Sequence, residues 1–277
     1  MVWVTSANIS TARNYLAGGG NSSNAICMGG SDGTNLAVTE LFNGNTWSTT
    51  GNLNTARIRL TGGGNSSDAI CMGGLIGSSS SGVSEKFNGS SWSTTGNLNT
   101  PRRSLAGGGN TSDAICMGGY DNSNLAVTEL FNGSTWSTTG SLNTARNGLA
   151  GGGNSSDAIC MGGTTGSDSV VSEKFNGSSW STTGNLNTAR AYLAGGGNSS
   201  DAICMGGYDV ANLAVTELFN GSTWSTTGNL NTSRRSLAGG GNTSDAICMG
   251  GFTTTYSAVT ELWSEGITRY FSFVNTM

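Results

Sequence analysis

The stretch that decides the fold spans residues 146–189 and reads RNGLAGGGNSSDAICMGGTTGSDSVVSEKFNGSSWSTTGNLNTA. Its one cysteine recurs along the chain in steps of 44, 45, 44, 44 and 44 residues, at Cys27, Cys71, Cys116, Cys160, Cys204 and Cys248. A tryptophan recurs in the same steps, at Trp3, Trp47, Trp92, Trp136, Trp180 and Trp224. Six copies of a unit of roughly 40 to 50 residues are typical of a propeller built from four-stranded blades.

Each unit is predicted to hold four short strands. In the quoted copy the first three cover residues 149–153, 158–161 and 170–175, and the fourth starts near Trp180. Asn-Ser-Ser-Asp between the first two suits a four-residue hairpin loop, and Asn-Gly between the last two indicates a two-residue turn. No segment shows the 3.6-residue apolar period of a helix. The sequence therefore predicts an all-β fold, a six-bladed β-propeller of four-stranded antiparallel blades.

Three consecutive glycines fill the first strand of every unit. In a ring of blades the innermost strands crowd around the axis. A strand without side chains lets six backbones approach one another closely there. We therefore expect the glycine strands to line the centre of the ring.

The whole chain, residues 1–277, is expected to form one domain, because six units account for almost all of it. Residues 3–13 read WVTSANISTAR and align with WSTTGNLNTAR at residues 47–57. Residues 2–9 are therefore an additional fourth strand. We expect this N-terminal strand to complete the last blade and close the ring. Residues 264–276 keep the same register and are the alternative occupant of that position.

Residues 266–277 form an aromatic tail that lacks the tryptophan of the repeat. We expect the tail to add outside blade six or to dock on another subunit, with Tyr270, Phe271 and Phe273 as interface residues. The alternative is that the tail packs over the edge of its own blade.

Composition limits the classes of partner. The net charge of −4 and the pI of about 4.7 argue against nucleic acid. The first residues lack the basic start and apolar core of a signal peptide, and no run of 18 apolar residues predicts a membrane span. The six cysteines, one per blade, are expected to be buried, too far apart to pair, and typical of a chain made in a reducing cytoplasm.

The repeated motif resembles the kelch repeat. The matching features are an Arg that opens the first strand, Gly-Gly after the second, Glu-x-Phe in the third and Trp in the fourth, six times over. The motifs Asn-Thr-Ala-Arg, Leu-Ala-Gly-Gly-Gly and Cys-Met-Gly-Gly are more similar to those of bacterial and bacteriophage kelch-like proteins than to those of animal ones. The resemblance implies a propeller that binds other molecules. Some kelch-like proteins, such as galactose oxidase, hold copper through His and Tyr. This chain has no histidine, so we expect no copper, other metal or cofactor.

Two segments of the unit vary between otherwise near-identical copies. They are the two residues after the repeated Arg and the three residues after the diglycine. In an antiparallel meander both segments emerge at the same end of the blade. Variable loops gathered on one face of a rigid scaffold are the usual layout of a binding surface. The alternative is that these loops have drifted without function.

Arginine and aromatic residues, a mixture enriched in contact sites, are concentrated in the variable segments. The residues predicted to bind a ligand are Arg59, Arg103, Arg235, Tyr15, Tyr120, Tyr192, Tyr208 and Phe252.

Two sets of charged residues do repeat. One arginine and one glutamate per unit are expected to form a structural ion pair in each blade; the alternative is an anion-binding crown at the channel mouth. The arginines are Arg13, Arg57, Arg102, Arg146, Arg190 and Arg234, and the glutamates are Glu40, Glu85, Glu129, Glu173, Glu217 and Glu261. The loop between the first and second strands ends in Asp in five of the six units and in Asn24 in the first. We interpret this Asp as a turn former, with calcium binding as the alternative.

These observations favour a non-enzymatic module that recognises a protein or a glycan through its variable face, as part of a phage or bacterial surface apparatus. The alternative function is assembly, in which the aromatic tail joins copies of the chain or docks it on a larger particle such as a virion. An enzyme is not expected, because a chain without histidine cannot supply a Ser-His-Asp set and no phosphate-binding loop is present.

Overall fold

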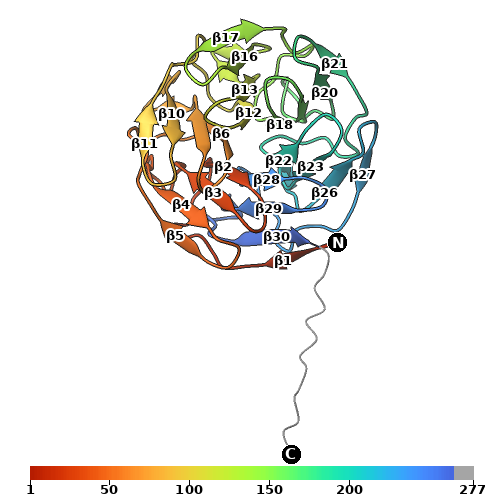
Figure 1. Ribbon diagram of the computed structural model, residues 1–277. Helices are drawn as coiled ribbons and strands as arrows, with labels where there is room; N and C mark the ends of the chain where they lie inside the picture. Colours follow the sequence, from red (N-terminus) through yellow and green to blue (C-terminus); the bar gives the residue numbers. More distant parts are fainter. Residues whose placement is uncertain (265–277) are drawn as a thin grey trace, which may run out of the picture.

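The computed structural model describes residues 1–264, which form six four-stranded antiparallel sheets around a central axis (Figure 1). Residues 1–264 contain no helix, and so none long and apolar enough to cross a membrane. The predicted all-β, six-bladed propeller is confirmed.

Each blade is ordered from the axis outward. The first three blades comprise β2 (Ala17–Gly20), β3 (Ala25–Met28), β4 (Thr39–Phe42) and β5 (Trp47–Thr49); β6 (Thr61–Gly64), β7 (Ala69–Met72), β10 (Ser84–Phe87) and β11 (Trp92–Thr94); and β12 (Ala106–Gly109), β13 (Ala114–Met117), β16 (Thr128–Phe131) and β17 (Trp136–Thr139). The last three comprise β18 (Ala150–Gly153), β19 (Ala158–Met161), β20 (Ser172–Phe175) and β21 (Trp180–Thr182); β22 (Ala194–Gly197), β23 (Ala202–Met205), β26 (Thr216–Phe219) and β27 (Trp224–Thr226); and β28 (Ala238–Gly241), β29 (Ala246–Met249), β30 (Thr260–Ser264) and β1 (Val2–Thr5).

The glycine strands line the axis, as expected (Figure 1). A Cβ added to Gly63 in β6 would lie 2.5 Å from the carbonyl oxygen of Gly109 in the next blade. Because the obstacle is backbone, no side-chain movement could relieve the contact. Glycine is therefore what allows the six innermost strands to meet.

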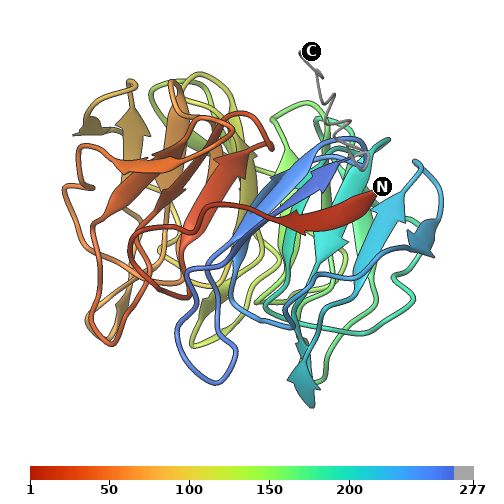
Figure 2. The same ribbon diagram turned by 90° about the horizontal axis from the view of Figure 1, so that it is seen from below.

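The sixth blade contains both ends of the described chain. β1 pairs with β30, so that Val2 lies opposite Ser264 and Trp3 opposite Trp263. Figure 2 shows the red β1 strand alongside the blue strands of this blade. Trp3 is buried and its ring centroid lies 5.4 Å from that of Trp263, so the strand carries the tryptophan that each other blade has in its fourth strand. The tail, residues 266–277, lies outside the described residues.

Apolar packing joins neighbouring blades. One cluster combines Ile115 and Met117 of blade three with Cys160, Phe175 and Trp180 of blade four. Equivalent clusters occupy the other boundaries between blades. Each blade therefore buries its apolar faces against two neighbours, which makes the ring the unit of stability.

The hairpin between the third and fourth strands differs from the prediction. Phe42 pairs with Trp47, so residues 43–46 form a four-residue loop and not a two-residue turn. Only Gly44 has a positive φ (90°), while Asn43 Oδ1 accepts hydrogen bonds from the backbone N–H of Asn45 and Thr46. The asparagine closes the loop with its side chain, which the Asn-Gly dipeptide alone does not reveal.

The repeated Arg and Glu form one buried ion pair in each blade, which agrees with the structural interpretation. The N–O distances run from 2.9 to 3.2 Å and all twelve side chains are fully buried. In blade four, Arg146 also bonds to Cys160 Sγ and to the carbonyl oxygens of Gly162 and Val171. Glu173 accepts hydrogen bonds from Asn143. These guanidinium groups are enclosed by protein and do not form a crown at the channel mouth.

Candidate functional site

Backbone pairing brings the two variable segments of each blade together. In blade three Arg103 forms an isolated bridge with Tyr120, and in blade six Arg235 forms one with Phe252. The corresponding residues bridge in the other four blades. The prediction that both segments lie at one end of the blades is therefore confirmed. We call this end the variable face.

Short hairpins extend the variable face. They are β8 (Leu75–Ile76) with β9 (Ser79–Ser80), β14 (Tyr120–Asp121) with β15 (Ser123–Asn124), and β24 (Tyr208–Asp209) with β25 (Ala211–Asn212). Val210, at the tip of the last hairpin, is 88% exposed and has a φ of 60°. A β-branched residue in this conformation is strained, and such strain is concentrated at functional sites.

A closed ring of backbone hydrogen bonds surrounds the axis on the variable face. The second residue after each repeated Arg donates its N–H to the carbonyl oxygen of its counterpart in the preceding blade, at 2.7–2.9 Å. The six residues have φ values of 52° to 62° and are Tyr15, Arg59, Ser104, Gly148, Tyr192 and Ser236. The ring fixes the backbone of one variable position in every blade, so the side chains there are presented by a rigid frame.

The eight predicted ligand-binding residues gather into three Arg–aromatic stacks. The Arg59 guanidinium lies 4.6 Å from the centroid of Tyr15, whose ring in turn meets Tyr192 edge-on at 6.3 Å. Arg103 lies 4.8 Å from the centroid of Tyr120. Cation–π contacts of this kind hold an arginine in place while leaving its hydrogen-bond donors available.

The third stack contains Arg235 between two rings. Its guanidinium lies 4.6 Å from the centroid of Tyr208 in blade five and 5.0 Å from that of Phe252 in its own blade. Arg235 also donates a hydrogen bond to Asn212 Oδ1 at 3.0 Å. This stack joins the loops of two blades.

Residues of two of the stacks line a small cavity. About 220 Å³ in volume, it is lined by Arg59, Arg103, Ser104, Tyr120, Asn147 and Tyr192, which come from blades two to five. Four of these six were predicted ligand-binding residues. We call this space the Arg59–Arg103 cavity. Arg235, Tyr208 and Phe252 lie outside it, and Tyr15 borders a smaller depression of about 70 Å³ on the axis itself.

Charge is distributed unevenly over the variable face. The cavity carries Arg59 and Arg103, whereas Asp168 of blade four lies near Asp209 of blade five and also acts electrostatically on Tyr192 of the cavity. Burial, and secondarily the Asp209 charge, raise the pKa of Asp168. Burial also raises the pKa of the Tyr192 phenol, which therefore stays protonated at neutral pH and able to donate a hydrogen bond.

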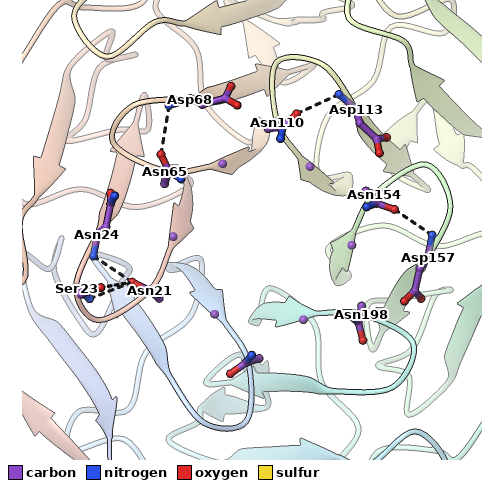
Figure 3. Close-up of a pocket in the computed structure, with 17 residues that line it drawn as sticks. Asn21, Ser23, Asn24, Asn65, Asp68, Asn110, Asp113, Asn154, Asp157 and Asn198 are labelled. Carbon is purple, nitrogen blue, oxygen red and sulfur yellow. Dashed lines mark hydrogen bonds between the residues drawn. The ribbon is translucent and has the colours of Figure 1, made fainter.

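The opposite mouth of the channel is a wide bowl of about 730 Å³, lined by repeated asparagines, aspartates and inner-strand glycines (Figure 3). Asn110 Oδ1 accepts the backbone N–H of Asp113 and shapes that hairpin. The Asp113 carboxylate instead accepts the N–H of Ser155 in the next blade at 2.9 Å. The interpretation of the aspartates as turn formers is therefore wrong. The asparagine makes the turn and the aspartate links the blades, through Asp68, Asp113, Asp157, Asp201, Asp245 and the equivalent Asn24.

Metal ligands are not gathered in this bowl or elsewhere in residues 1–264, where no three His, Cys, Asp or Glu side chains are placed to hold an ion. All six cysteines are buried and unpaired, as predicted. Tyr270, Phe271 and Phe273, the predicted interface residues, lie outside the described part of the chain.

Sequence reasoning missed two residues of the cavity. Ser104 and Asn147 lie in the same variable pair as the predicted arginines, but they are neither charged nor aromatic. Their position in the two variable residues after the repeated Arg was the one feature of the sequence that could have identified them. The ring of hydrogen bonds was also missed, because a positive φ at Tyr15, Arg59 or Ser104 is not encoded by those residue types.

Comparison with known proteins establishes the fold alone. No protein-family model matches the chain, and no curated protein matches it. The solved structure of YjhT is similar, with a TM-score of 0.74 and 14% identity over 94% of this chain and 97% of the other. At that identity the similarity supports the propeller architecture and carries no statement about ligand or activity.

Proposed function

We propose that this propeller is a non-enzymatic binding module that recognises a protein or glycan ligand on its variable face. The observation that carries the proposal is the gathering of the eight non-repeated arginine and aromatic residues into three stacks on one face. The other mouth is lined by nearly identical loops in all six blades. Sequence differences between blades are thus concentrated on the surface that a ligand would contact.

Two further features support this function. The backbone ring fixes its six variable residues before any ligand arrives, which lowers the entropy cost of binding. The exposed Val210 offers an apolar contact at a hairpin tip. The resemblance to bacterial and phage kelch-like repeats supports placing the module on a phage or bacterial surface apparatus, after synthesis in a reducing cytoplasm.

The test is a binding screen against immobilised glycans and bacterial surface proteins. The triple variant Arg59→Ala/Arg103→Ala/Arg235→Ala should lose the captured ligand and keep its circular dichroism spectrum. The matched control is Lys86→Ala/Lys174→Ala, which removes two cations that bond to Gly133 and Gly221 in Asn-Gly loops. Equal loss in both variants would show that charge alone, and not the variable face, captures the ligand.

A second candidate function, assembly, is favoured by the edge of blade six. Val2 and Val4 of the outermost strand β1 are 49% and 47% exposed, where the other blades carry serine or threonine before the tryptophan and serine after it. An exposed apolar edge strand is a site for pairing with another chain or with the aromatic tail. Light scattering on the full chain and on a chain lacking residues 266–277 tests this: a smaller assembly after the deletion supports assembly through the tail, an unchanged oligomer supports pairing through β1, and a monomeric full chain refutes assembly.

A further inference from the structure

We propose that the Arg59–Arg103 cavity is the subsite for the carboxylate of an acidic saccharide. This inference rests on the proposed function, since it assigns the ligand class of the same face.

Arg59 is a cation without a polar partner. Among residues 1–264 its guanidinium makes no hydrogen bond and no ion pair, and its Nε is buried. Every ion pair of the described chain uses the repeated arginines instead. A buried donor left unsatisfied is unfavourable, and an acceptor on a ligand would satisfy it.

Arg103 supplies the second cation of the cavity. It donates one hydrogen bond to Ser80 Oγ at 3.0 Å and stacks on Tyr120, and it too has no acidic partner within the described residues. Two guanidinium groups facing one small space attract an anion, and the planar fork of arginine matches the two oxygens of a carboxylate.

Both arginines are fixed before the ligand binds. Arg59 has a φ of 55°, donates its N–H to Tyr15 and lies over the Tyr15 ring. Arg103 is bridged to Tyr120 by backbone pairing. Little side-chain entropy remains to be lost, so each contact with an oxyanion contributes more to affinity than it would from a mobile surface arginine.

The remaining wall of the cavity is polar. Ser104 adds a hydroxyl, Tyr120 and Tyr192 add phenols, and Asn147 adds an amide whose Nδ2 is oriented by Asn124 Oδ1 at 2.6 Å. No aliphatic side chain lines the cavity. A protein anchor would need an apolar pocket. Hydroxyl and amide groups beside two cations instead suit the hydroxyl groups and carboxylate of an acidic sugar. At about 220 Å³ the cavity is smaller than a typical whole-ligand pocket, so it accommodates one residue of a longer chain.

The experiment is calorimetric titration of the full chain with glucuronic acid, with glucose as the neutral analogue. Glucuronic acid should bind at least tenfold more tightly than glucose. Arg59→Met and Arg103→Met should each weaken its binding at least tenfold. The control Lys86→Met removes a cation that bonds to the Gly133 carbonyl oxygen and lies outside the cavity, and should leave the dissociation constant unchanged.

Three results would overturn the proposal: equal affinity for glucose and glucuronic acid, unchanged binding in Arg59→Met with an unchanged unfolding midpoint, or weakening by Lys86→Met as large as by Arg103→Met. A tetra-aspartate peptide serves as the competing anion. If it binds and glucuronic acid does not, the saccharide assignment fails while the binding role of the variable face stands. If the wider glycan and protein screen also yields nothing on that face, the proposed function itself fails.

Discussion

The indole Nε1 of Trp92 in blade two donates a hydrogen bond to Thr39 Oγ1 in blade one, at 2.9 Å. The same bond links neighbouring blades through Trp3, Trp47 and Trp180, each of which donates to a threonine at the start of the third strand of the preceding blade. Two of the six fourth-strand tryptophans lack it. Trp136 and Trp224 follow blades in which serine replaces that threonine, and within residues 1–264 neither the indole nor the serine hydroxyl has a partner.

Restoring threonine at these positions should stabilise the ring. The β-branched side chain limits χ1 and would hold its hydroxyl toward the indole. We expect Ser84→Thr and Ser172→Thr each to raise the free energy of unfolding by about 1 kcal/mol. The midpoint of thermal unfolding, followed by tryptophan fluorescence, measures the gain. The reverse change, Thr39→Ser, should cost a similar amount; a gain from it would contradict the explanation.

The contact between inner strands predicts the effect of a single methyl group. A Cβ on Gly196 would lie 2.5 Å from the carbonyl oxygen of Gly241, whereas a Cβ on Gly228 would meet no atom closer than 3.7 Å. Gly196→Ala must push two backbones apart and should destabilise the protein by about 3 kcal/mol. Gly228→Ala is the control and should change the unfolding free energy by less than about 1 kcal/mol. Urea denaturation distinguishes the two; equal effects would mean that the ring is not tightly closed.

The fold was predictable because its signals are local and repeated six times. The 44-residue period, the glycine strand and the apolar run Ala158–Met161 each follow from spacing or residue type alone. The two-residue Asn-Gly turn was predicted wrongly because the asparagine side chain, and not its backbone, closes the loop. Turn geometry of this kind depends on hydrogen bonds that composition does not specify.

The candidate site was predictable only in part. Differences between blades identified Arg59 and Arg103, and the meander topology placed them on one face. The cavity itself depends on the positive φ of Arg59 and on the stacking of Arg103 over Tyr120, which are tertiary features. The aspartates were misinterpreted for the same reason: Asp113 bonds to the next blade, a contact that its own loop sequence does not contain.

Backbone strain at Val210 predicts a trade between stability and binding. Its φ of 60° suits glycine, which occupies the equivalent position in three blades, as Gly33, Gly77 and Gly166. Val210→Gly should raise the free energy of unfolding by about 1 kcal/mol by relieving the left-handed strain. The same variant should bind a ligand of the variable face more weakly. Thr254→Gly, at the equivalent position in blade six but without a positive φ, is the control and should gain no stability.

The buried thiols predict sensitivity to alkali. Burial raises the pKa of Cys27 to about 11 and that of Cys71 to about 12, and it raises the pKa of the equivalent thiols in the other blades. An unfolded cysteine titrates near about 8.5. Between these values the folded chain holds more protons than the unfolded chain, so stability is fully present below about pH 8.5 and falls as the pH rises toward about 11.

Each thiol should contribute a loss of about 1.4 kcal/mol per pH unit over that range. Denaturation curves at pH 8, 9 and 10 measure how the unfolding free energy changes with pH. Cys27→Ala should reduce this slope by the contribution of one thiol, about 1.4 kcal/mol per pH unit. At pH 8 iodoacetamide should label the unfolded chain and leave the native thiols unmodified. Rapid native labelling, or a slope unaffected by Cys27→Ala, would contradict the burial argument.

Because β1 pairs with β30, we predict that the stability of the closed ring depends on residues 1–9. Trp3 is 5% exposed, packs on Trp263 and donates a hydrogen bond to Thr216, so Trp3→Ala should cost about 3–5 kcal/mol. Val4 on the same strand is 47% exposed, and Val4→Thr, the control, should have little effect. Deleting residues 1–9 should leave β30 as an unpaired edge, lower the unfolding midpoint and promote association between copies. A synthetic peptide of residues 1–9 added to the shortened chain should restore the midpoint, because it supplies the missing strand without a covalent link. If the shortened chain is as stable as the full chain, and becomes unstable only when residues 266–277 are also removed, the C-terminal segment can occupy the same position, and closure by the N-terminal strand is not required.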